Sequence, residues 1–189
     1  MNLELINQYK IVNKLKSTYR TTAVGDRFEN SAEHTWGVLM LAEFFLPQID
    51  EKLNKQRIME LILYHDLVEA YTGDVPFLPG QTQDDKYEKE EQAAKQLAAD
   101  LPESMRDPFM SAFTEYELQE SVESHFAKAC DVIEPLINEL DSDKNWKRTN
   151  RAFIEEHKKV FVSKFPVILE AFTQVLDFAQ SKGYFIEPK

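Results

Sequence analysis

The residues best suited to chemistry are concentrated in one string, Y-H-D-L-V-E-A-Y-T-G-D-V-P at residues 64–76. His65 and Asp66 are neighbours, and neighbouring side chains on a helix project about 100° apart, which suits two residues that converge on one ion in a groove. Glu69 lies four residues after His65 and three after Asp66, so it shares their side of a helix. The string therefore offers one imidazole and two carboxylates at a single place.

Two further polar residues lie inside otherwise apolar helical segments. His34 is found in A-E-H-T-W-G-V-L-M-L, and Asp131 is found in F-A-K-A-C-D-V-I-E-P-L. A single buried histidine is more often a hydrogen-bonded core residue than a ligand, and a buried carboxylate is costly unless it is paired or bound to a metal. Taken with His65 and Asp66, however, they supply two imidazoles and two carboxylates. That mixed set suits one divalent ion (Mn²⁺, Co²⁺, Fe²⁺, Zn²⁺ or Mg²⁺) with open positions for water and substrate.

Several other site classes are excluded by their missing motifs. The chain has no G-x-S-x-G elbow, no P-loop, no G-x-G-x-x-G and no H-E-x-x-H. Ferritin-like di-iron sites require a glutamate three residues before a histidine. Those positions hold Ser31, Ile62, Val122 and Ile154. Cys130 is the only cysteine, so neither an intrachain disulfide nor a cysteine-based zinc site is available.

The elements that must position these residues are predicted to be helices. Apolar residues recur at helical spacing in most of the chain, and no useful stretch alternates at period two. Asn30 and Glu33 have the spacing of a capping box, and Gly73 is a natural helix stop. The predicted helices cover about 2–16, 30–47, 54–72, 84–100, 102–116, 120–140 and 146–182, the last with a break at Pro166, and the predicted loops cover 17–29 and 73–83.

Length and charge limit the class of protein and its partners. The chain has 189 residues and only five glycines, which favours one helical domain. The net charge of −11 repels phosphate backbones and anionic membranes, so we expect no nucleic-acid polymer and no membrane as a partner. No segment has the pattern of a signal peptide or a membrane span, so a cytoplasmic location is expected.

Four further residues are predicted to be structural. Trp36 and Phe44 lie eight residues apart on one side of a helix and are expected in the core. His157, in I-E-E-H-K-K, is expected to be exposed on a charged helix, and Cys130 is expected to be a small buried hydrophobe.

Three stretches together resemble a known family. They are R-F-E-N-S-A-E-H at 27–34, H-D-L-V-E-A-Y-T-G-D-V-P at 65–76 and A-K-A-C-D at 127–131. The pattern resembles the HD-domain metal-dependent phosphohydrolases, and in particular their 5′-deoxynucleotidase branch of YfbR-type bacterial enzymes and the eukaryotic HD-domain-containing protein 2. The resemblance implies an all-α fold, a single HD-domain bundle of about six to eight helices over 1–189, with the motifs in about 15–140. It also implies a homodimer. Region 146–182 is expected to pack on the domain or, through its aromatic side chains, at a subunit interface.

The resemblance also implies a set of roles for single residues. The metal ligands are His34, His65, Asp66 and Asp131, the catalytic acids are Glu69 and Asp74, and the phosphate-binding arginine is Arg20. Lys128 lies three residues before Asp131 on the same helical side, so it is a second candidate to bind the phosphate. Thr21 stands where the bacterial enzymes have a tryptophan, so only a weak preference for deoxyribose is expected.

These assignments predict a metal-dependent phosphomonoesterase that acts on (deoxy)nucleoside 5′-monophosphates. The ion lowers the pKa of a bound water, while Glu69 and Asp74 share the proton transfers. Two alternatives remain open, namely an HD-fold hydrolase of another nucleotide or phosphate ester and a non-catalytic nucleotide sensor. Ala70 counts against stringent-nucleotide hydrolases, which carry H-D-x-x-E-D, and His125 alone cannot supply the two extra histidines of HD-type di-iron oxygenases.

Overall fold

Helices make up most of the computed structural model, which describes residues 2–76, 79 and 86–186. The 3₁₀ helices are labelled η. The elements are α1 (Leu3–Tyr9), η1 (Lys10–Ser17), β1 (Tyr19–Val24), β2 (Arg27–Asn30), α2 (Ser31–Phe45), η2 (Leu46–Gln48), α3 (Lys55–Tyr64), α4 (Glu69–Thr72), α5 (Lys86–Asp100), α6 (Glu103–Leu118), α7 (Val122–Asn138), η3 (Trp146–Arg148), α8 (Arg151–Val162) and α9 (Pro166–Ser181). The predicted helical fold is confirmed, with one small hairpin added to it.

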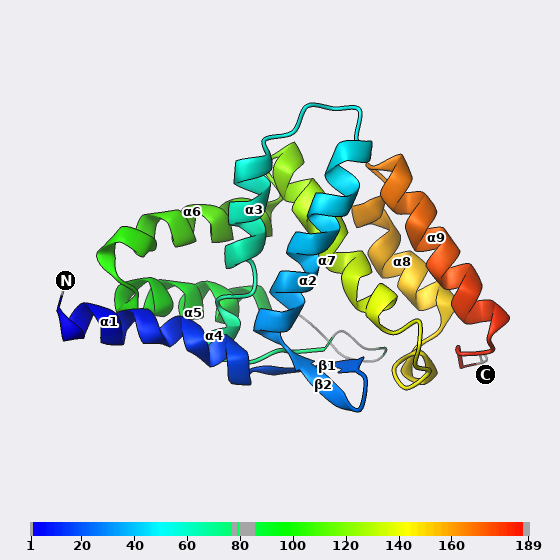
Figure 1. Ribbon diagram of the computed structural model, residues 1–189, viewed down its shortest axis with the longest axis horizontal. Coiled ribbons are helices and arrows are strands. Elements are labelled where there is room, and N and C mark those ends of the chain that lie inside the picture. The colour runs from blue at the N-terminus through cyan, green and yellow to red at the C-terminus, as the bar shows by residue number, and fades with distance from the viewer. Residues whose placement is uncertain (1, 77–78, 80–85, 187–189) are drawn as a thin grey trace.

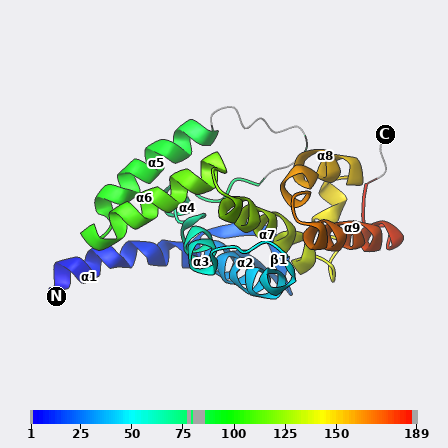
Figure 2. The same cartoon turned by 90° about the horizontal axis from the view of Figure 1, so that it is seen from above.

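Helix α7 lies at the centre of the molecule (Figures 1 and 2). It contacts α2 and α3 on one side and α8 and α9 on the other. Its apolar residues Phe126, Cys130 and Ile133 are fully buried, which confirms the predicted burial of Cys130. Each large side chain removed from water in this way stabilises the fold by about 1.5–3 kcal/mol, so α7 is a rigid support for Asp131.

The start of α2 follows the predicted capping box. The Asn30 side chain accepts a hydrogen bond from the Glu33 amide at 3.1 Å, and the Asn30 amide donates to the Glu33 carboxylate at 3.1 Å. These bonds satisfy backbone donors that the first turn leaves unpaired. The capped helix fixes His34 at a defined depth below its N-terminus.

A β-hairpin replaces the predicted loop 17–29, so that prediction was wrong. Strand β1 pairs antiparallel with β2 and is irregular between Tyr19 and Ala23. The two-residue turn begins with Gly25 at φ 59°, the position at which a type II′ turn takes glycine. The dipeptide Gly25–Asp26 between two β-prone stretches is the hairpin signal in the sequence.

The predicted helix 54–72 is divided into α3 and α4, which also differs from the prediction. Residues 65–68 between them form turns, and the amides of Leu67, Glu69 and Tyr71 each bond to the carbonyl three residues earlier, at 3.1, 3.0 and 2.9 Å. Such i→i+3 bonds tighten the chain relative to an α-helix. His65 and Asp66 thus lie in the tightened turn, and Gly73 ends α4 as predicted, with φ 71°.

Two other predictions about helices are corrected. The predicted helix 2–16 is an α-helix only to Tyr9 and continues as the 3₁₀ helix η1. Trp36 and Phe44 are 66% and 62% exposed, so they are not core residues; the opposite face of α2, with Val38, Ala42 and Phe45, packs inward. Because α2 is apolar on both faces, periodicity alone could not identify the buried one.

The C-terminal region folds back onto the rest of the chain. Helices α8 and α9 separate just before Pro166, as predicted, and both contact α7. Parts of the predicted loop 73–83 and the start of the predicted helix 84–100 lie outside the described residues. No helix in the described part of the chain has the length and apolarity that a bilayer crossing requires.

Candidate active site

Side chains from α2, the turn after α3 and α7 converge at one place. His34 Nε2 lies 3.0 Å from Asp131 Oδ1 and 3.7 Å from Asp66 Oδ2. His65 Nε2 lies 3.3 Å from Asp66 Oδ2 and 3.8 Å from Asp131 Oδ1. The structure thus brings together all four residues that the sequence proposed as metal ligands.

The hydrogen bonds of the two histidines fix which nitrogen faces this cluster. His65 Nδ1 donates to the Ile62 carbonyl at 2.7 Å, and His34 Nδ1 donates to Glu134 Oε2 at 2.7 Å. Each neutral ring therefore carries its lone pair on Nε2, toward the carboxylates. His65 Nε2 is buried and has no hydrogen-bond partner within the described residues. Two lone pairs and two carboxylates that face one another repel unless a cation lies between them, so the donor set fits a divalent ion.

The electrostatics around His34 also favour a positive charge at this place. Burial and Arg20 would lower the pKa of His34, but its hydrogen bonds to Asp131 and Glu134 outweigh both and raise it to about 10. Although burial raises the pKa of Asp131, Lys128 and the two histidines hold it well below its usual range. In the absence of an ion, a proton on His34 therefore supplies the positive charge that the carboxylates require.

A buried polar layer behind His34 was missed in the sequence. Asn138 Nδ2 donates to Glu134 Oε1 at 2.5 Å and to Glu29 Oε2 at 3.2 Å, and both glutamates are almost fully buried. This layer explains the second group of metal-capable side chains, Glu29, His34 and Glu134. Gly37 leaves the space for Glu134, because a Cβ there would lie 2.3 Å from Glu134 Oε1. In the sequence, Glu29 lies in E-N-S-A-E-H and Glu134 lies in the E-P that follows Asp131. Nothing in the spacing of these two stretches indicated that the glutamates lie close together.

Glu69 lies beside the cluster, held by a serine. Ser31 Oγ donates to Glu69 Oε2 at 2.5 Å, and Ser31 is fully buried at the start of α2. Burial and the neighbouring Asp66 carboxylate raise the pKa of Glu69 to about 8. A carboxylate with its pKa near neutrality is suited to proton transfer.

Arg20 extends from β1 into the group of carboxylates. Its guanidinium lies 3.0 Å from Glu29, 3.1 Å from Asp66 and 3.5 Å from Asp74. It is also 3.9 Å from Glu69. Burial lowers the pKa of Arg20, but the carboxylates of Asp66, Glu69 and Asp74 raise it by more, so the group is a permanent cation. Strand β1 of the hairpin, which the sequence predicted as a loop, places Arg20 in the site.

Lys128 and Tyr116 hold the other side of Asp131. Lys128 Nζ lies 2.8 Å from Asp131 Oδ2, and the Tyr116 hydroxyl donates to the same oxygen at 2.7 Å. Burial and Asp131 raise the pKa of Tyr116, which keeps its proton in place. Oδ2 is thus occupied, and Oδ1 is turned to the histidines. His125, by contrast, lies against Lys164 and not in this cluster.

A cavity of about 480 Å³ opens onto the cluster. Its lining includes Arg20, Asp66, Glu69, Asp74 and Asp131, together with part of α8. The α8 side chains at the cavity are Phe153, Ile154, His157, Lys158 and Phe161. His157 is half-buried and stacks on Phe153 with ring centroids 4.3 Å apart, so the prediction that it is exposed was wrong.

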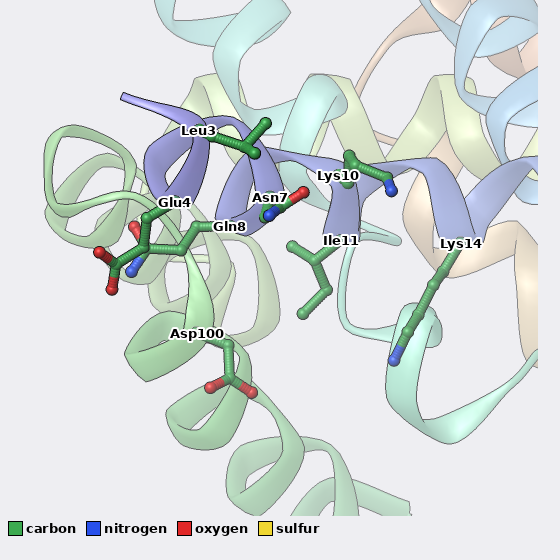
Figure 3. A pocket seen from close by; sticks show the side chains of 8 residues that line it. All are labelled: Leu3, Glu4, Asn7, Gln8, Lys10, Ile11, Lys14 and Asp100. Atoms are coloured by element: carbon green, nitrogen blue, oxygen red, sulfur yellow. The ribbon is translucent and has the colours of Figure 1, made fainter. Parts of the chain in front are cut away.

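A second hollow, between α1, η1 and α5, is shown in Figure 3. Two of its polar lining residues, Lys14 and Asp100, have structural roles. Asp100 accepts a hydrogen bond from the Tyr71 hydroxyl at 2.5 Å, and Lys14 Nζ lies 4.4 Å from the centre of the Tyr71 ring. These contacts hold α4, and with it Glu69, against η1 and α5. None of the eight residues predicted for the site lines this hollow.

Comparisons with known proteins identify the family and the fold of this chain. A family model described as HD domain matches residues 12–171. The human protein 5′-deoxynucleotidase HDDC2 is 32% identical over 135 residues, which cover 71% of this chain and 63% of the human one. The chain thus spans less than two thirds of that relative.

Solved structures give the same fold. A predicted metal-dependent phosphohydrolase from Magnetospirillum magnetotacticum superimposes with a TM-score of 0.87 at 27% identity, over 97% of this chain and 95% of that one. An HD-domain phosphohydrolase from Listeria innocua superimposes with a TM-score of 0.68 at 19% identity, over 95% and 92% of the two chains, and supports the fold alone.

Proposed function

Because this chain belongs to the HD domain family of metal-dependent phosphohydrolases, we propose that it releases inorganic phosphate from nucleoside 5′-monophosphates. The observation that carries the proposal is the cluster of His34, His65, Asp66 and Asp131, of which the two aspartates line a cavity together with Arg20. A phosphoryl group would lie near Arg20 and the two aspartates, and the remaining volume would accommodate a nucleoside.

The proposed ligands of a single divalent ion are these four side chains. When bound there, such an ion supplies a water of lowered pKa and polarises a phosphoryl oxygen. Asp131 is oriented by Lys128 and Tyr116, and His34 is oriented by Glu134, so the ligand atoms are held before the ion arrives. The identity of the metal is left to elemental analysis of the purified protein.

Glu69 is the proposed general base. Ser31 holds one of its oxygens, while the other lies 3.9 Å from Arg20, so the carboxylate is fixed next to Asp66. Deprotonated Glu69 would accept a proton from the attacking water. Asp74, 3.5 Å from Arg20, is the proposed second catalytic acid: it would relay the proton that Glu69 takes from the water to the leaving 5′-oxygen.

Arg20 and Lys128 are the proposed contacts to the phosphate. Both line the cavity, and both are now paired with carboxylates of the site. A phosphoryl group would take over part of these interactions, and a guanidinium binds it through paired hydrogen bonds.

A mononucleotide is the proposed substrate because of size and charge. A cavity of about 480 Å³ accommodates one small ligand, and the net charge of −11 disfavours a nucleic-acid polymer. The name of the human relative, a 5′-deoxynucleotidase, adds support. Thr21 at the cavity is small, so we expect deoxyribose to be favoured only weakly.

The test is a phosphate-release assay on a panel of substrates. It compares 5′- and 3′-monophosphates, ribo and deoxy, with a dinucleotide and a triphosphate, each in Mn²⁺, Co²⁺ and Mg²⁺, and uses a chelator as the control. Release from 5′-monophosphates, abolished by the chelator, is expected. Activity confined to triphosphates or cyclic dinucleotides would overturn the substrate class, and tight nucleotide binding without turnover would point to a sensor.

Homodimerisation is a further part of the proposal. Size-exclusion chromatography with light scattering would measure it directly, and a monomeric mass across the assay concentrations would contradict it.

A further inference from the structure

Three cations line the cavity, and two of them are already engaged. Arg20 lies within 3.5 Å of Asp66 and Asp74, and Lys128 lies 2.8 Å from Asp131. Lys158, on α8, lines the same cavity but has neither an ion pair nor a hydrogen bond with any residue in 2–76, 79 and 86–186. It is therefore the cavity cation whose charge is left for a ligand.

The packing of α8 on α7 places Lys158 close to the metal cluster. Figure 1 shows α8 running back alongside α7, and the two helices are in contact. Lys128 Nζ of α7 lies 5.8 Å from the centre of the Phe161 ring of α8. Lys158 lies about one turn before Phe161, and Asp131 lies about one turn after Lys128. Because α7 and α8 are antiparallel, one turn back along α8 and one turn forward along α7 point in the same direction. Lys158 therefore lies at the level of Asp131.

The surroundings of Lys158 make a free ammonium unfavourable. The side chain is half-buried between α7 and α8, and burial lowers its pKa, which the Asp131 carboxylate only partly offsets. A half-buried charge without a paired counter-ion is costly, and an anion in the cavity would remove that cost.

We propose that Lys158 is a phosphate-binding residue that α8 contributes to the site, with its ammonium in contact with the phosphoryl oxygens of the bound ligand. The inference rests on the proposed function for the phosphate-bearing substrate. A phosphate is the anion expected because the cavity joins this ammonium to Arg20 and to the metal cluster, and strongly charged oxygens match all three. The region 146–182, which carries no recognisable motif, would then supply part of the substrate site.

The experiment compares Lys158→Met with Lys159→Met in the metal-loaded full chain. Methionine keeps the length and apolar stem of lysine, and Lys159 is an exposed neighbour on the same helix. Binding of inorganic phosphate is measured by calorimetry, and KM is measured for a nucleoside 5′-monophosphate. Lys158→Met should weaken phosphate binding and raise KM by about 10-fold or more, the scale of one lost charged hydrogen bond. Lys159→Met should leave both unchanged, and Lys158→Arg should retain most of the affinity.

Metal content and thermal unfolding distinguish a binding role from a structural one. Lys158→Met should keep the metal, and if it does not fold, Lys158→Gln replaces it. Unchanged phosphate affinity in the Lys158 variant would overturn the inference, and so would loss of the metal, since the effect would then act through Asp131. If the unmodified protein cleaves no 5′-monophosphate but Lys158→Met still loses phosphate affinity, the proposed substrate is wrong and the role of Lys158 stands.

Discussion

Replacing Gly37 with alanine should weaken metal binding while the protein stays folded. A Cβ at this position would lie 2.3 Å from Glu134 Oε1 and 3.0 Å from Glu134 Cδ, well inside ordinary contact distance. The atom that must yield is the far end of a side chain and not the backbone, so the helices need not separate. The carboxylate of Glu134 would instead be pushed away by about 1 Å.

That displacement reaches the metal site through one hydrogen bond. Glu134 Oε2 accepts from His34 Nδ1 at 2.7 Å, and a shift of about 1 Å takes the pair beyond hydrogen-bonding distance. His34 then loses the partner that fixes its ring and its tautomer. Loss of such a partner behind a metal ligand usually costs about 10–100-fold in metal affinity, or about 1.4–2.8 kcal/mol. Alanine has a greater helix propensity than glycine, which stabilises the helix by about 1 kcal/mol. The free energy of unfolding of the metal-free protein should therefore change less than the free energy of metal binding.

The assay is a titration of the metal-free protein with Mn²⁺ against a competing chelator, alongside thermal unfolding without metal. Glu134→Ala is the matched variant, since it removes the same hydrogen bond without a clash. If both changes act through His34, the double variant should lose little more affinity than either single one. Wild-type affinity in Gly37→Ala, or losses that add in the double variant, would refute this reasoning.

The remaining predictions concern the cluster and the cavity. Asp66→Ala should lose stoichiometric metal, measured by elemental analysis, and retention of metal with full rate would refute its assignment as a ligand. Glu69→Gln should keep metal and substrate binding while kcat falls by about 10²-fold or more in the phosphate-release assay; loss of metal would place Glu69 among the ligands. Arg20→Ala should lower kcat/KM without changing metal content, and an unchanged kcat/KM would remove it from the phosphate site. Burial raises the pKa of Glu139 from 4.5 to about 7, so the folded protein holds this proton more tightly than the unfolded chain does, and its contribution to stability is lost as the pH rises from about 4.5 through 7. The free energy of unfolding should therefore fall between pH 5 and pH 8, and Glu139→Gln should reduce this fall by at most about 3 kcal/mol. Urea unfolding in chelator at the two pH values measures it, and an identical pH dependence in the two proteins would contradict the prediction.

The helical fold and the four candidate metal ligands were accessible from the sequence because helical periodicity, and polar residues that interrupt it, are local features. Asn30 and Glu33 form the predicted capping box, and the apolar spacing of residues 120–140 matches the buried face of α7. Polar residues within apolar helices are costly, so His34 and Asp131 already indicated a common partner. The sequence could not show how the chain tightens between α3 and α4, because four turn residues inside a helical pattern leave the periodicity almost unchanged.

Tertiary structure alone decided which distant residues complete the site. Glu134 and Glu29 are 105 positions apart, yet Asn138 binds both beneath His34, and no local rule links residues at such separation. The exposure of Trp36 was decided in the same way, since α2 offers two apolar faces and only its packing against α3, α7 and η1 chooses between them. Lys158 has the sequence context of an ordinary solvated charge. It lies at the cavity because α8 returns along α7, and that return is set by the burial of apolar surface contributed by the whole chain.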